Sequence, residues 1–346
     1  MEEISKKLLT KQSDSIIICL QKNETAVSQC ETLTNREGFK LKWEKIHGLF
    51  VPMITPFKPE DESIYEEGII NYSNFLIENG VDGVIPCGSS GEFVSLETDE
   101  QIRVNDLVCK AVDGRVKVYC GTAAYSTRKT VELSKQAQAS GADGVMIVTP
   151  YYLVPNEDEL YAHYAAVREA IDIPIMLYHN PYYSGVLMTD EFMAKLYNDG
   201  IIQAIKERQA DVFRIQKLRW LTDEGFSIFY GYDISEIEAI VMGADGWVAG
   251  LGNLFPAENK KIITLMDEGK QKEAIDWHYK KIMPYLQLFM SPTEKGYGTP
   301  WMAYLKEGLA MRGVNVGVPR KPLQALQPAE KEKLRKLLAE YGHLKA

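Results

Sequence analysis

The chain has 346 residues, 45% of them hydrophobic and 25% charged, which is the balance of an ordinary globular protein. Its formal net charge of −9, without any block of basic residues, argues against a protein that binds nucleic acid. The longest apolar run falls far short of the roughly 20 residues that a membrane span needs, so we expect neither nucleic acid nor membrane as a partner.

Residues 1–46 differ in character from the rest of the chain. They mix acidic and basic residues around one short apolar patch, Ile16–Leu20. A signal peptide has a longer apolar centre and a mitochondrial presequence has few acidic residues, so neither fits. We interpret the segment as a poorly ordered N-terminal extension. An upstream start codon wrongly included in the reading frame would explain it equally well.

The five cysteines bear on the cellular compartment. Cys19, Cys30, Cys87, Cys109 and Cys120 form no CxxC pair and no zinc-binding spacing. A scattered, odd-numbered set is typical of a reducing environment. We therefore expect a cytoplasmic protein and no metal site.

From Leu49 onward, short runs rich in β-branched residues alternate with amphipathic stretches that have apolar residues three and four apart. Eight strands are predicted, at Leu49–Ile54, Gly83–Pro86, Val116–Cys120, Gly144–Val148, Ile173–His179, Ile201–Glu207, Phe226–Asp233 and Gly246–Gly250. The helices expected between them include Glu66–Asn79, Thr98–Ala111, Ser126–Ser140 and Asn156–Ala170.

The predicted strands begin 20 to 34 residues apart, which is the spacing of consecutive βα units. Eight such units close into a (β/α)8 TIM barrel, which we place over residues 47–255. Residues 256–346 contain more helix than a barrel needs, so the predicted fold class is an α/β TIM barrel with a C-terminal helical extension packed on it. Its helices are expected at Ala257–Glu268, Lys270–Met290, Pro300–Met311 and Ala329–Tyr341.

Barrel enzymes carry their active sites at the carboxyl ends of the strands. Lys206 lies at the end of the predicted sixth strand, Ile201–Glu207. Burial disfavours an ammonium ion and lowers its pKa, which can produce a nucleophilic amine. A lysine beside an apolar run more often keeps its ammonium group in water. A catalytic role for Lys206 therefore depends on the neighbouring strand ends.

The predicted second strand ends in the turn Cys87-Gly-Ser-Ser-Gly-Glu92. The backbone N–H groups and hydroxyls of Gly88, Ser89 and Ser90 can converge on an anion such as a carboxylate. The competing interpretation is a βα turn with a structural role only, because such turns can have the same pattern.

Tyrosines follow two further strands. Tyr178 ends the fifth strand, next to the strand of Lys206, so its phenol can approach the amine and serve as proton donor and acceptor. Tyr152 follows the fourth strand. Either tyrosine alone is more often a packing residue, but their combination with Lys206 and the Gly-Ser-Ser-Gly turn favours a site.

These motifs together resemble the pyruvate-dependent class I aldolases and lyases, the family that includes dihydrodipicolinate synthase and N-acetylneuraminate lyase. The resemblance runs from His47 to the C-terminus. It rests on four segments in the family's order, Gly83–Glu92, Thr149–Tyr152, Tyr178–Pro181 and Ile205–Glu207. It implies a Schiff-base enzyme without a cofactor, assembled as a homo-oligomer, a dimer or usually a tetramer.

The resemblance also implies roles for individual residues. Lys206 condenses with the keto group of pyruvate or another 2-oxo acid, and the imine acts as an electron sink at C3. Tyr178 moves protons, and Ser89 relays them between Tyr178 and Tyr152. The tyrosine at the position of Tyr152 comes from a neighbouring subunit in relatives. Ser89 and Ser90 hold the keto-acid carboxylate.

Departures from the family pattern bear on the substrate. Synthases usually carry an arginine where this chain has Tyr183, which weakens a synthase role. Gly231 and Asp233, at the end of the seventh strand, look like the lyase positions that contact a sugar hydroxyl chain. The acidic residue that follows in lyases is Ile234 here, which weakens sialic acid as the substrate.

Arg208 suggests a substrate feature of this chain. Side chains alternate along a strand, so residues 206 and 208 share a face if the strand continues. We hypothesise that Arg208 supplies the carboxylate-binding fork missing at Tyr183 and favours an acidic substrate. A loop residue directed to solvent is the competing interpretation.

The favoured function is a carbon–carbon or carbon–oxygen lyase acting on pyruvate, a 2-keto-3-deoxy sugar acid or a related 2-oxo acid. The alternative within this chemistry is 4-hydroxy-tetrahydrodipicolinate synthase, which joins pyruvate and aspartate semialdehyde. A metabolite-binding barrel without turnover could lose Lys206 or Tyr178, and this chain keeps both. A metal-dependent aldolase needs converging ligands, and among scattered histidines only His179 ends a barrel strand.

Overall fold

A computed structural model describes residues 43–290 and 300–344. Most of the predicted N-terminal extension, residues 1–42, lies outside the described residues. Lys45 begins a compact unit and pairs with Asp245, while the Ile46 N–H donates to Ser227 Oγ at 3.0 Å. Among the described residues, none of the helices combines the length and apolar character that crossing a bilayer takes.

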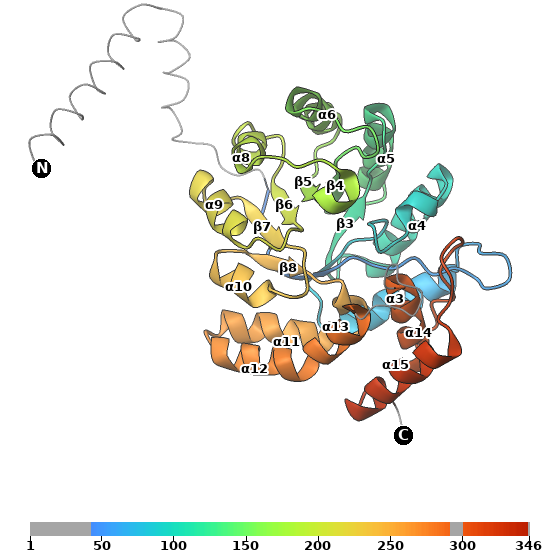
Figure 1. Ribbon diagram of the computed structural model, residues 1–346. Coiled ribbons are helices and arrows are strands. Elements are labelled where there is room, and N and C mark those ends of the chain that lie inside the picture. The colour runs from blue at the N-terminus through green and yellow to red at the C-terminus, as the bar shows by residue number, and fades with distance from the viewer. Residues whose placement is uncertain (1–42, 291–299, 345–346) are drawn as a thin grey trace, which may run out of the picture. The chain divides into compact units, whose positions relative to one another are not determined.

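Eight parallel strands form a closed barrel in which each pairs with its neighbours in chain order and the last pairs with the first, as Figure 1 shows. The strands are β1 (Gly48–Val51), β2 (Gly83–Val84), β3 (Lys117–Gly121), β4 (Gly144–Val148), β5 (Ile175–His179), β6 (Ala204–Glu207), β7 (Ser227–Tyr230) and β8 (Gly246–Val248). This arrangement confirms the predicted TIM barrel.

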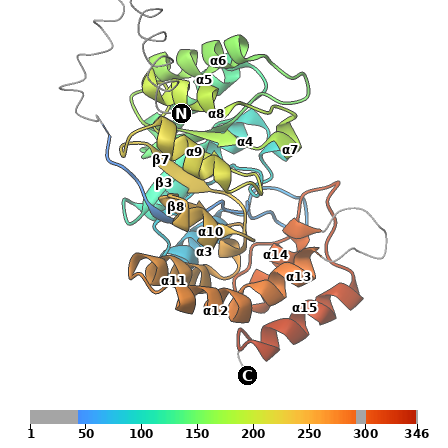
Figure 2. The ribbon, with the colours of Figure 1, turned by 60° about the vertical axis from the view of Figure 1, so that its left-hand side comes forward.

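Helices alternate with the strands and cover the outside of the barrel (Figure 1). They are α3 (Glu66–Glu78), α4 (Thr98–Val112), α5 (Thr127–Ala139), α6 (Glu157–Ala170), α7 (Pro181–Ser184), α8 (Asp190–Asn198), α9 (Phe213–Leu221) and α10 (Glu236–Val241), with short 3-10 turns η1 (Phe93–Ser95) and η2 (Leu251–Asn253). The C-terminal helices are α11 (Pro256–Asp267), α12 (Gln271–Lys281), α13 (Met283–Met290), α14 (Trp301–Met311) and α15 (Pro328–Glu340), which gather on one side in Figure 2.

Prolines explain three of the places where predicted and observed elements differ. The single helix predicted over Lys270–Met290 is wrong, because α12 and α13 are separated at Ile282. Pro284, in the first turn of α13, has no N–H group and cannot continue a preceding helix. Likewise β1 ends before Pro52 and β2 before Pro86, short of the predicted strand ends.

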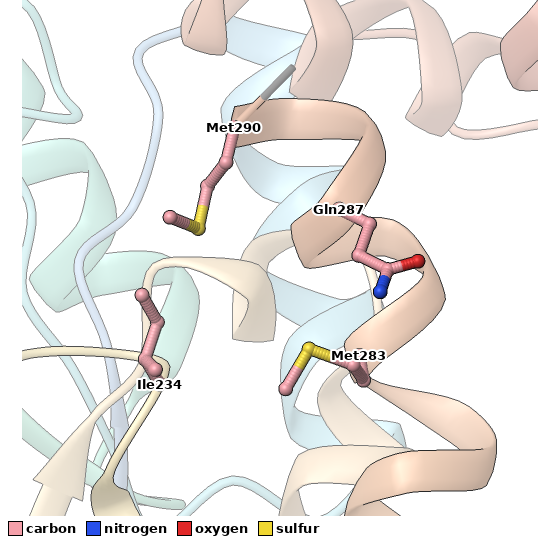
Figure 3. A pocket seen from close by; sticks show the side chains of 4 residues that line it. All are labelled: Ile234, Met283, Gln287 and Met290. Atoms are coloured by element: carbon pink, nitrogen blue, oxygen red, sulfur yellow. The ribbon is translucent and has the colours of Figure 1, made fainter.

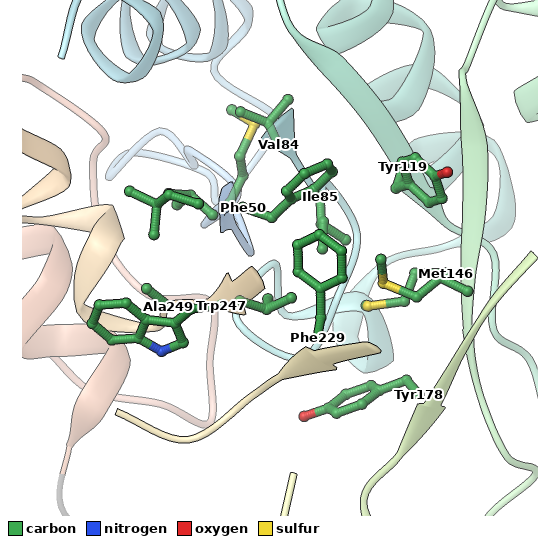
Figure 4. Packing of buried hydrophobic residues seen from close by; sticks show 14 of the residues in the cluster. Phe50, Val84, Ile85, Tyr119, Met146, Tyr178, Phe229, Trp247 and Ala249 are labelled. Carbon is green, nitrogen blue, oxygen red and sulfur yellow. The ribbon is translucent and has the colours of Figure 1, made fainter. Parts of the chain in front are cut away.

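Aromatic rings fill the barrel interior beside glycines of neighbouring strands (Figure 4). The register pairs are Phe50 with Gly83, Tyr119 with Gly144, and Phe229 with Gly246. A Cβ atom on any of these glycines would lie 2.3 to 2.4 Å from a ring carbon of its partner. The three rings form a connected layer, with centroids of Phe50 and Phe229 4.9 Å apart and of Phe50 and Tyr119 5.8 Å apart. This layer closes the barrel interior.

One buried ion pair joins the C-terminal helices to the turn after β2. Lys306 of α14 is 1% exposed, and its Nζ lies 2.7 Å from Glu92 Oε1. The same ammonium group donates to the carbonyl oxygens of Thr55 and Val318, each at 2.8 Å. The pair therefore links the Gly-Ser-Ser-Gly turn to α14.

Candidate active site

Lys206 points into the barrel from the carboxyl end of β6. It pairs in register with Tyr178 of β5, and its Nζ lies 4.1 Å from the centroid of the Tyr178 ring. The side chain is buried, and burial lowers the pKa of the amine to about 7, helped by the positive charge of Arg208 and opposed by Asp233. Near neutral pH a large share of Lys206 is thus an uncharged nucleophile.

Gly231, at the end of β7, provides the space that Lys206 occupies. A Cβ atom on Gly231 would lie 2.7 Å from Lys206 Cε and 3.0 Å from its Cγ. The sequence suggested a substrate contact for Gly231. The structure places it against the lysine side chain, so its first effect is on the position of the amine.

Tyr178 is buried beside the amine, and its phenol oxygen accepts a hydrogen bond from Asn180 Nδ2 at 2.8 Å. Burial raises the pKa of Tyr178 to about 12, although the charge of Arg208 and the side chains of Asn180 and Ser89 act to lower it. The phenol is therefore a protonated donor at neutral pH.

The turn from Gly88 to Gly91 follows β2 and is closed by a hydrogen bond from the Gly91 N–H to the Gly88 carbonyl at 2.9 Å. Thr55 Oγ1 donates to the Gly91 carbonyl at 2.7 Å and holds the turn from outside. Within the ranges that the structure covers, the backbone N–H groups of Ser89 and Ser90 donate to no protein acceptor. Two adjacent unoccupied donors suit an anion such as a carboxylate.

Asp233 is buried, and both of its carboxylate oxygens accept hydrogen bonds from the protein. Oδ1 accepts from Trp247 Nε1 at 3.1 Å and from the Gly250 N–H at 3.0 Å, while Oδ2 accepts from the Leu251 N–H at 3.0 Å. Burial raises the pKa of Asp233 to about 6 despite these bonds. The carboxylate thus organises the end of β8 and acts on Lys206 through its charge.

Arg208 lies beside the amine and the phenol. The Arg208 N–H donates to the His179 carbonyl at 3.0 Å, which extends the pairing of β6 with β5 by one residue. The side chain is half-buried, with its guanidinium carbon 4.9 Å from the centroid of the Tyr232 ring. In the described part of the chain this guanidinium forms no ion pair with a carboxylate. It is available to an anionic ligand.

Tyr152 is the predicted site residue that the structure does not bring to the others. Its side chain is 90% exposed, and its backbone has a positive φ of 76°, which is uncommon outside glycine. Across residues 43–290 and 300–344 it makes no hydrogen bond or ring contact. Leu153 and Val154 beside it are also exposed. This segment therefore does not complete the site of its own chain.

Two features near the site were not identified from the sequence. The first is Asn180, which lies in the quoted Tyr178–Pro181 segment, where its place before a proline indicates only a turn. The second is a buried pair behind the strands, in which His179 Nδ1 lies 2.7 Å from Glu207 Oε2. Since His179 Nε2 accepts from the Met188 N–H at 3.2 Å, Nδ1 carries the proton. This pair joins β5 and β6 one residue beyond Tyr178 and Lys206.

A cavity of about 520 Å³ opens beside the residue that follows Asp233 (Figure 3). It is lined by Ile234, Met283, Gln287 and Met290. Lys206 and Tyr178 are not among the residues that line it. Its lining is mostly apolar, and the side chain of Ile234 faces the two methionines of α13.

The chain was compared with known proteins. Residues 45–341 match the model of the dihydrodipicolinate synthetase family. The chain is 34% identical over 295 residues to 4-hydroxy-tetrahydrodipicolinate synthase of Syntrophus aciditrophicus strain SB, which covers 85% of this chain and 98% of that one.

Solved structures agree with this match. Dihydrodipicolinate synthase from Aquifex aeolicus superposes with a TM-score of 0.79 at 31% identity, covering 87% of this chain and all of that one. YagE, a prophage protein of the dihydrodipicolinic acid synthase family from E. coli K12 solved in complex with pyruvate, superposes with a TM-score of 0.78 at 27% identity, covering 86% of this chain and 99% of that one.

Proposed function

Because the chain belongs to the dihydrodipicolinate synthetase family, whose members are lyases of the class I aldolase type, we propose that Lys206 forms the Schiff base and that pyruvate or a related 2-oxo acid is its substrate. The observation that carries this proposal is a buried amine with a pKa of about 7, packed against the ring of a protonated phenol. Both groups lie at the carboxyl ends of barrel strands, where such enzymes act.

The proposed reaction begins when the neutral Nζ of Lys206 attacks the keto carbon, and a proton passes from the nitrogen to the new alkoxide to give a carbinolamine. The carbinolamine loses its hydroxyl as water with a proton from Tyr178, while the nitrogen lone pair forms the C=N bond. The Tyr178 phenolate then takes a proton from C3, which gives an enamine that attacks an aldehyde, and Tyr178 returns the proton to the alkoxide formed at C4. In the reverse direction the C3–C4 bond breaks as the C4 hydroxyl gives up its proton. The unoccupied N–H groups of Ser89 and Ser90 are suited to hold the carboxylate throughout.

Borohydride trapping tests the proposal. The protein is incubated with a panel of 2-oxo acids that includes pyruvate, reduced, digested and mapped by mass spectrometry. We expect one adduct, on Lys206, and none in Lys206→Ala. Lys306 serves as an internal control, because it is also buried but is paired with Glu92. Failure of the whole panel on folded protein would overturn the proposal in favour of a binding protein without turnover.

We further propose that Arg208 selects an acceptor aldehyde that carries a carboxylate. Arg208 follows Lys206 by two residues and its Cβ lies beside Gly231, as Lys206 does, and its charge lowers the pKa of both Lys206 and Tyr178. A guanidinium binds a carboxylate through two parallel hydrogen bonds. The synthase reaction has such an acceptor, aspartate semialdehyde, whereas a 2-keto-3-deoxy sugar acid is built from a neutral aldehyde.

Steady-state kinetics with aspartate semialdehyde and glyceraldehyde as acceptors distinguish the two reactions. We expect Arg208→Gln to raise KM for aspartate semialdehyde about tenfold or more and to leave KM for glyceraldehyde nearly unchanged, because only the first acceptor loses a charged partner. Arg208→Lys keeps the charge but cannot form two parallel hydrogen bonds, so its KM for aspartate semialdehyde should lie between those of wild type and Arg208→Gln. Equal KM values for aspartate semialdehyde in wild type and Arg208→Gln would show that Arg208 does not bind this acceptor.

We also propose that the protein is a homo-oligomer in which Tyr152 acts in the site of a neighbouring copy. The exposed side chain, the left-handed backbone and the exposed apolar neighbours support this assignment. Mixing inactive Tyr152→Phe with inactive Lys206→Ala tests it. After equal mixing about half of the dimers are mixed, and one of the two sites in each mixed dimer is complete. About a quarter of the wild-type rate should therefore return. No recovery after subunit exchange, or a monomer in sedimentation, would refute it.

We propose a cytoplasmic location for the protein. Cys87, Cys109 and Cys120 are free thiols, and the sulfur atoms of Cys109 and Cys120 lie 3.7 Å apart without a disulfide bond. Buried thiols this close persist in a reducing compartment. Cell fractionation checks the location, and recovery of the protein outside the cytoplasm would contradict it.

A further inference from the structure

Asn180 occupies a position where its side chain ordinarily has a local structural task. It is the N-cap residue of α7, and asparagine is among the preferred N-cap residues because its side-chain oxygen accepts from the first turn of the helix. Here the side chain makes no capping hydrogen bond. The α7 turn is held by backbone and hydroxyl donors instead, since the Asn180 carbonyl accepts from the Ser184 N–H and from Ser184 Oγ, each at 3.0 Å.

The Asn180 amide is directed at Tyr178. The residue is fully buried, and its Nδ2 donates to the phenol oxygen at 2.8 Å. Its Oδ1 is also buried and has no hydrogen-bond partner among the described residues. An unpaired buried polar group destabilises the fold, so the Oδ1 end adds nothing to stability. Within the described residues, the one hydrogen bond that this side-chain amide makes is to the phenol.

The residues on either side restrict the position of Asn180. His179 before it is hydrogen-bonded to Glu207, and Pro181 after it has a fixed φ and begins α7. The amide is thus attached to a segment that is held at both ends, which suits a donor that has to meet one atom.

We propose that Asn180 is a positioning residue that holds the Tyr178 phenol oxygen beside Lys206 and stabilises its anionic form after proton transfer. The inference rests on the proposed function. When Tyr178 gives its proton to the hydroxyl that leaves the carbinolamine, the phenol becomes a phenolate. The hydrogen bond from Asn180 Nδ2 then has an ionised acceptor, and such bonds are roughly twice as strong as neutral ones. The phenolate recovers a proton from C3 or from a substrate hydroxyl in the next step.

Three variants test this role: Asn180→Ala, Asn180→Asp and the control Ser184→Ala, which removes a hydrogen bond from the same turn without touching Tyr178. The readout is the exchange of the pyruvate methyl protons in D2O, followed by NMR from pH 5 to about 9. We expect Asn180→Ala to lower kcat about 10- to 100-fold with little change in KM, less than the loss of a donor to a reacting oxyanion itself. Ser184→Ala should stay near wild type.

The pH profile separates this role from a purely structural one. The carboxyl group introduced by Asn180→Asp can donate only while it is protonated, and its ionised form repels the phenolate. The rate of this variant relative to wild type should therefore rise as the pH falls, while the relative rate of Asn180→Ala stays flat. A flat ratio for Asn180→Asp, or equal losses in Asn180→Ala and Ser184→Ala, would overturn the proposal.

A measurement without substrate keeps the inference distinct from the proposed function. If wild type forms no adduct on Lys206 and exchanges no methyl protons, the proposed function fails. The hydrogen bond is then tested by NMR of protein labelled at the tyrosine Cζ carbons, with the Tyr178 signal identified as the one missing in Tyr178→Phe. We expect Asn180→Ala to shift this signal and Ser184→Ala to leave it in place. An unshifted signal refutes the role.

Discussion

At the scale of single residues, the environment of Lys206 determines how the enzyme responds to pH. Only the neutral amine attacks a keto carbon, and burial together with the charge of Arg208 lowers the pKa of Lys206 from 10.5 to about 7. The rate of imine trapping with pyruvate should accordingly rise as the pH increases through about 7 and level off above about 8.

Arg208→Gln should move the midpoint of this profile to higher pH, because it removes a cation that disfavours the ammonium form. Arg208→Lys serves as the control, since it keeps the charge and should keep the midpoint. Trapping rates measured across the range give both values. A wild-type midpoint near 10, or identical midpoints in all three proteins, contradicts the electrostatic description of the site.

Gly231 leaves room for the side chain of Lys206, so we expect its substitution to affect catalysis through steric contact. A methyl group there would lie 2.7 Å from Lys206 Cε, so the amine has to move in Gly231→Ala. A displacement of about 1 Å can reduce a rate about 100-fold, and we expect a loss of this order in kcat. Urea unfolding measured in parallel shows whether the fold is retained. A folded Gly231→Ala protein with the wild-type rate of pyruvate trapping would show that the contact has no effect.

At the scale of elements, the ion pair of Glu92 and Lys306 connects the turn after β2 to α14. Burial lowers the pKa of Lys306 to about 8, while Glu92 acts to raise it, so the charge of Lys306 depends on its partner. Removal of one partner leaves an unpaired charge inside the protein. We expect Lys306→Met and Glu92→Gln each to lower the free energy of unfolding by about 3–5 kcal/mol.

In the double variant Glu92→Gln/Lys306→Met, the free energy of unfolding should fall by much less than the sum of the decreases in the two single variants, because no unpaired charge remains. Lys321→Ala is the matched control. Its pair with Glu62 is exposed, with 84% of the lysine side chain accessible, and such pairs contribute about 0–1 kcal/mol. Urea unfolding gives all four values. Additive losses in the double variant would show that the two charges are independent.

At the scale of the whole molecule, the barrel closes around aromatic rings that need glycines beside them. A Cβ atom on Gly144 would lie 2.4 Å from a ring carbon of Tyr119. Gly144→Ala should therefore lower the free energy of unfolding by about 1–3 kcal/mol through overpacking. Adding Tyr119→Leu removes the ring and should recover part of this loss. If Gly144→Ala has the stability of wild type, the interior is not packed as tightly as described.

Much of the fold followed from local pattern. The alternation of eight β-branched runs with amphipathic stretches predicted the barrel, since both patterns depend on neighbouring residues alone. The proximity of Lys206 and Tyr178, the proposed catalytic pair, followed from the sequence because the two residues end adjacent strands, and the structure pairs them in register. Local pattern failed at element boundaries. Ile201 and Ile202 looked like strand residues, yet their N–H groups donate to the Leu196 carbonyl at the end of α8.

The sequence by itself determined the fold class, the family resemblance and the residues that gather at one end of the barrel. Only the tertiary structure decided which atoms meet there. It turned the Asn180 amide to Tyr178, engaged both oxygens of Asp233 within the protein and kept Tyr152 out of its own site. The reason is physical: strand order places residues on an edge, whereas rotamers and hydrogen-bond partners depend on side chains that are distant in the chain and adjacent only after the barrel has closed.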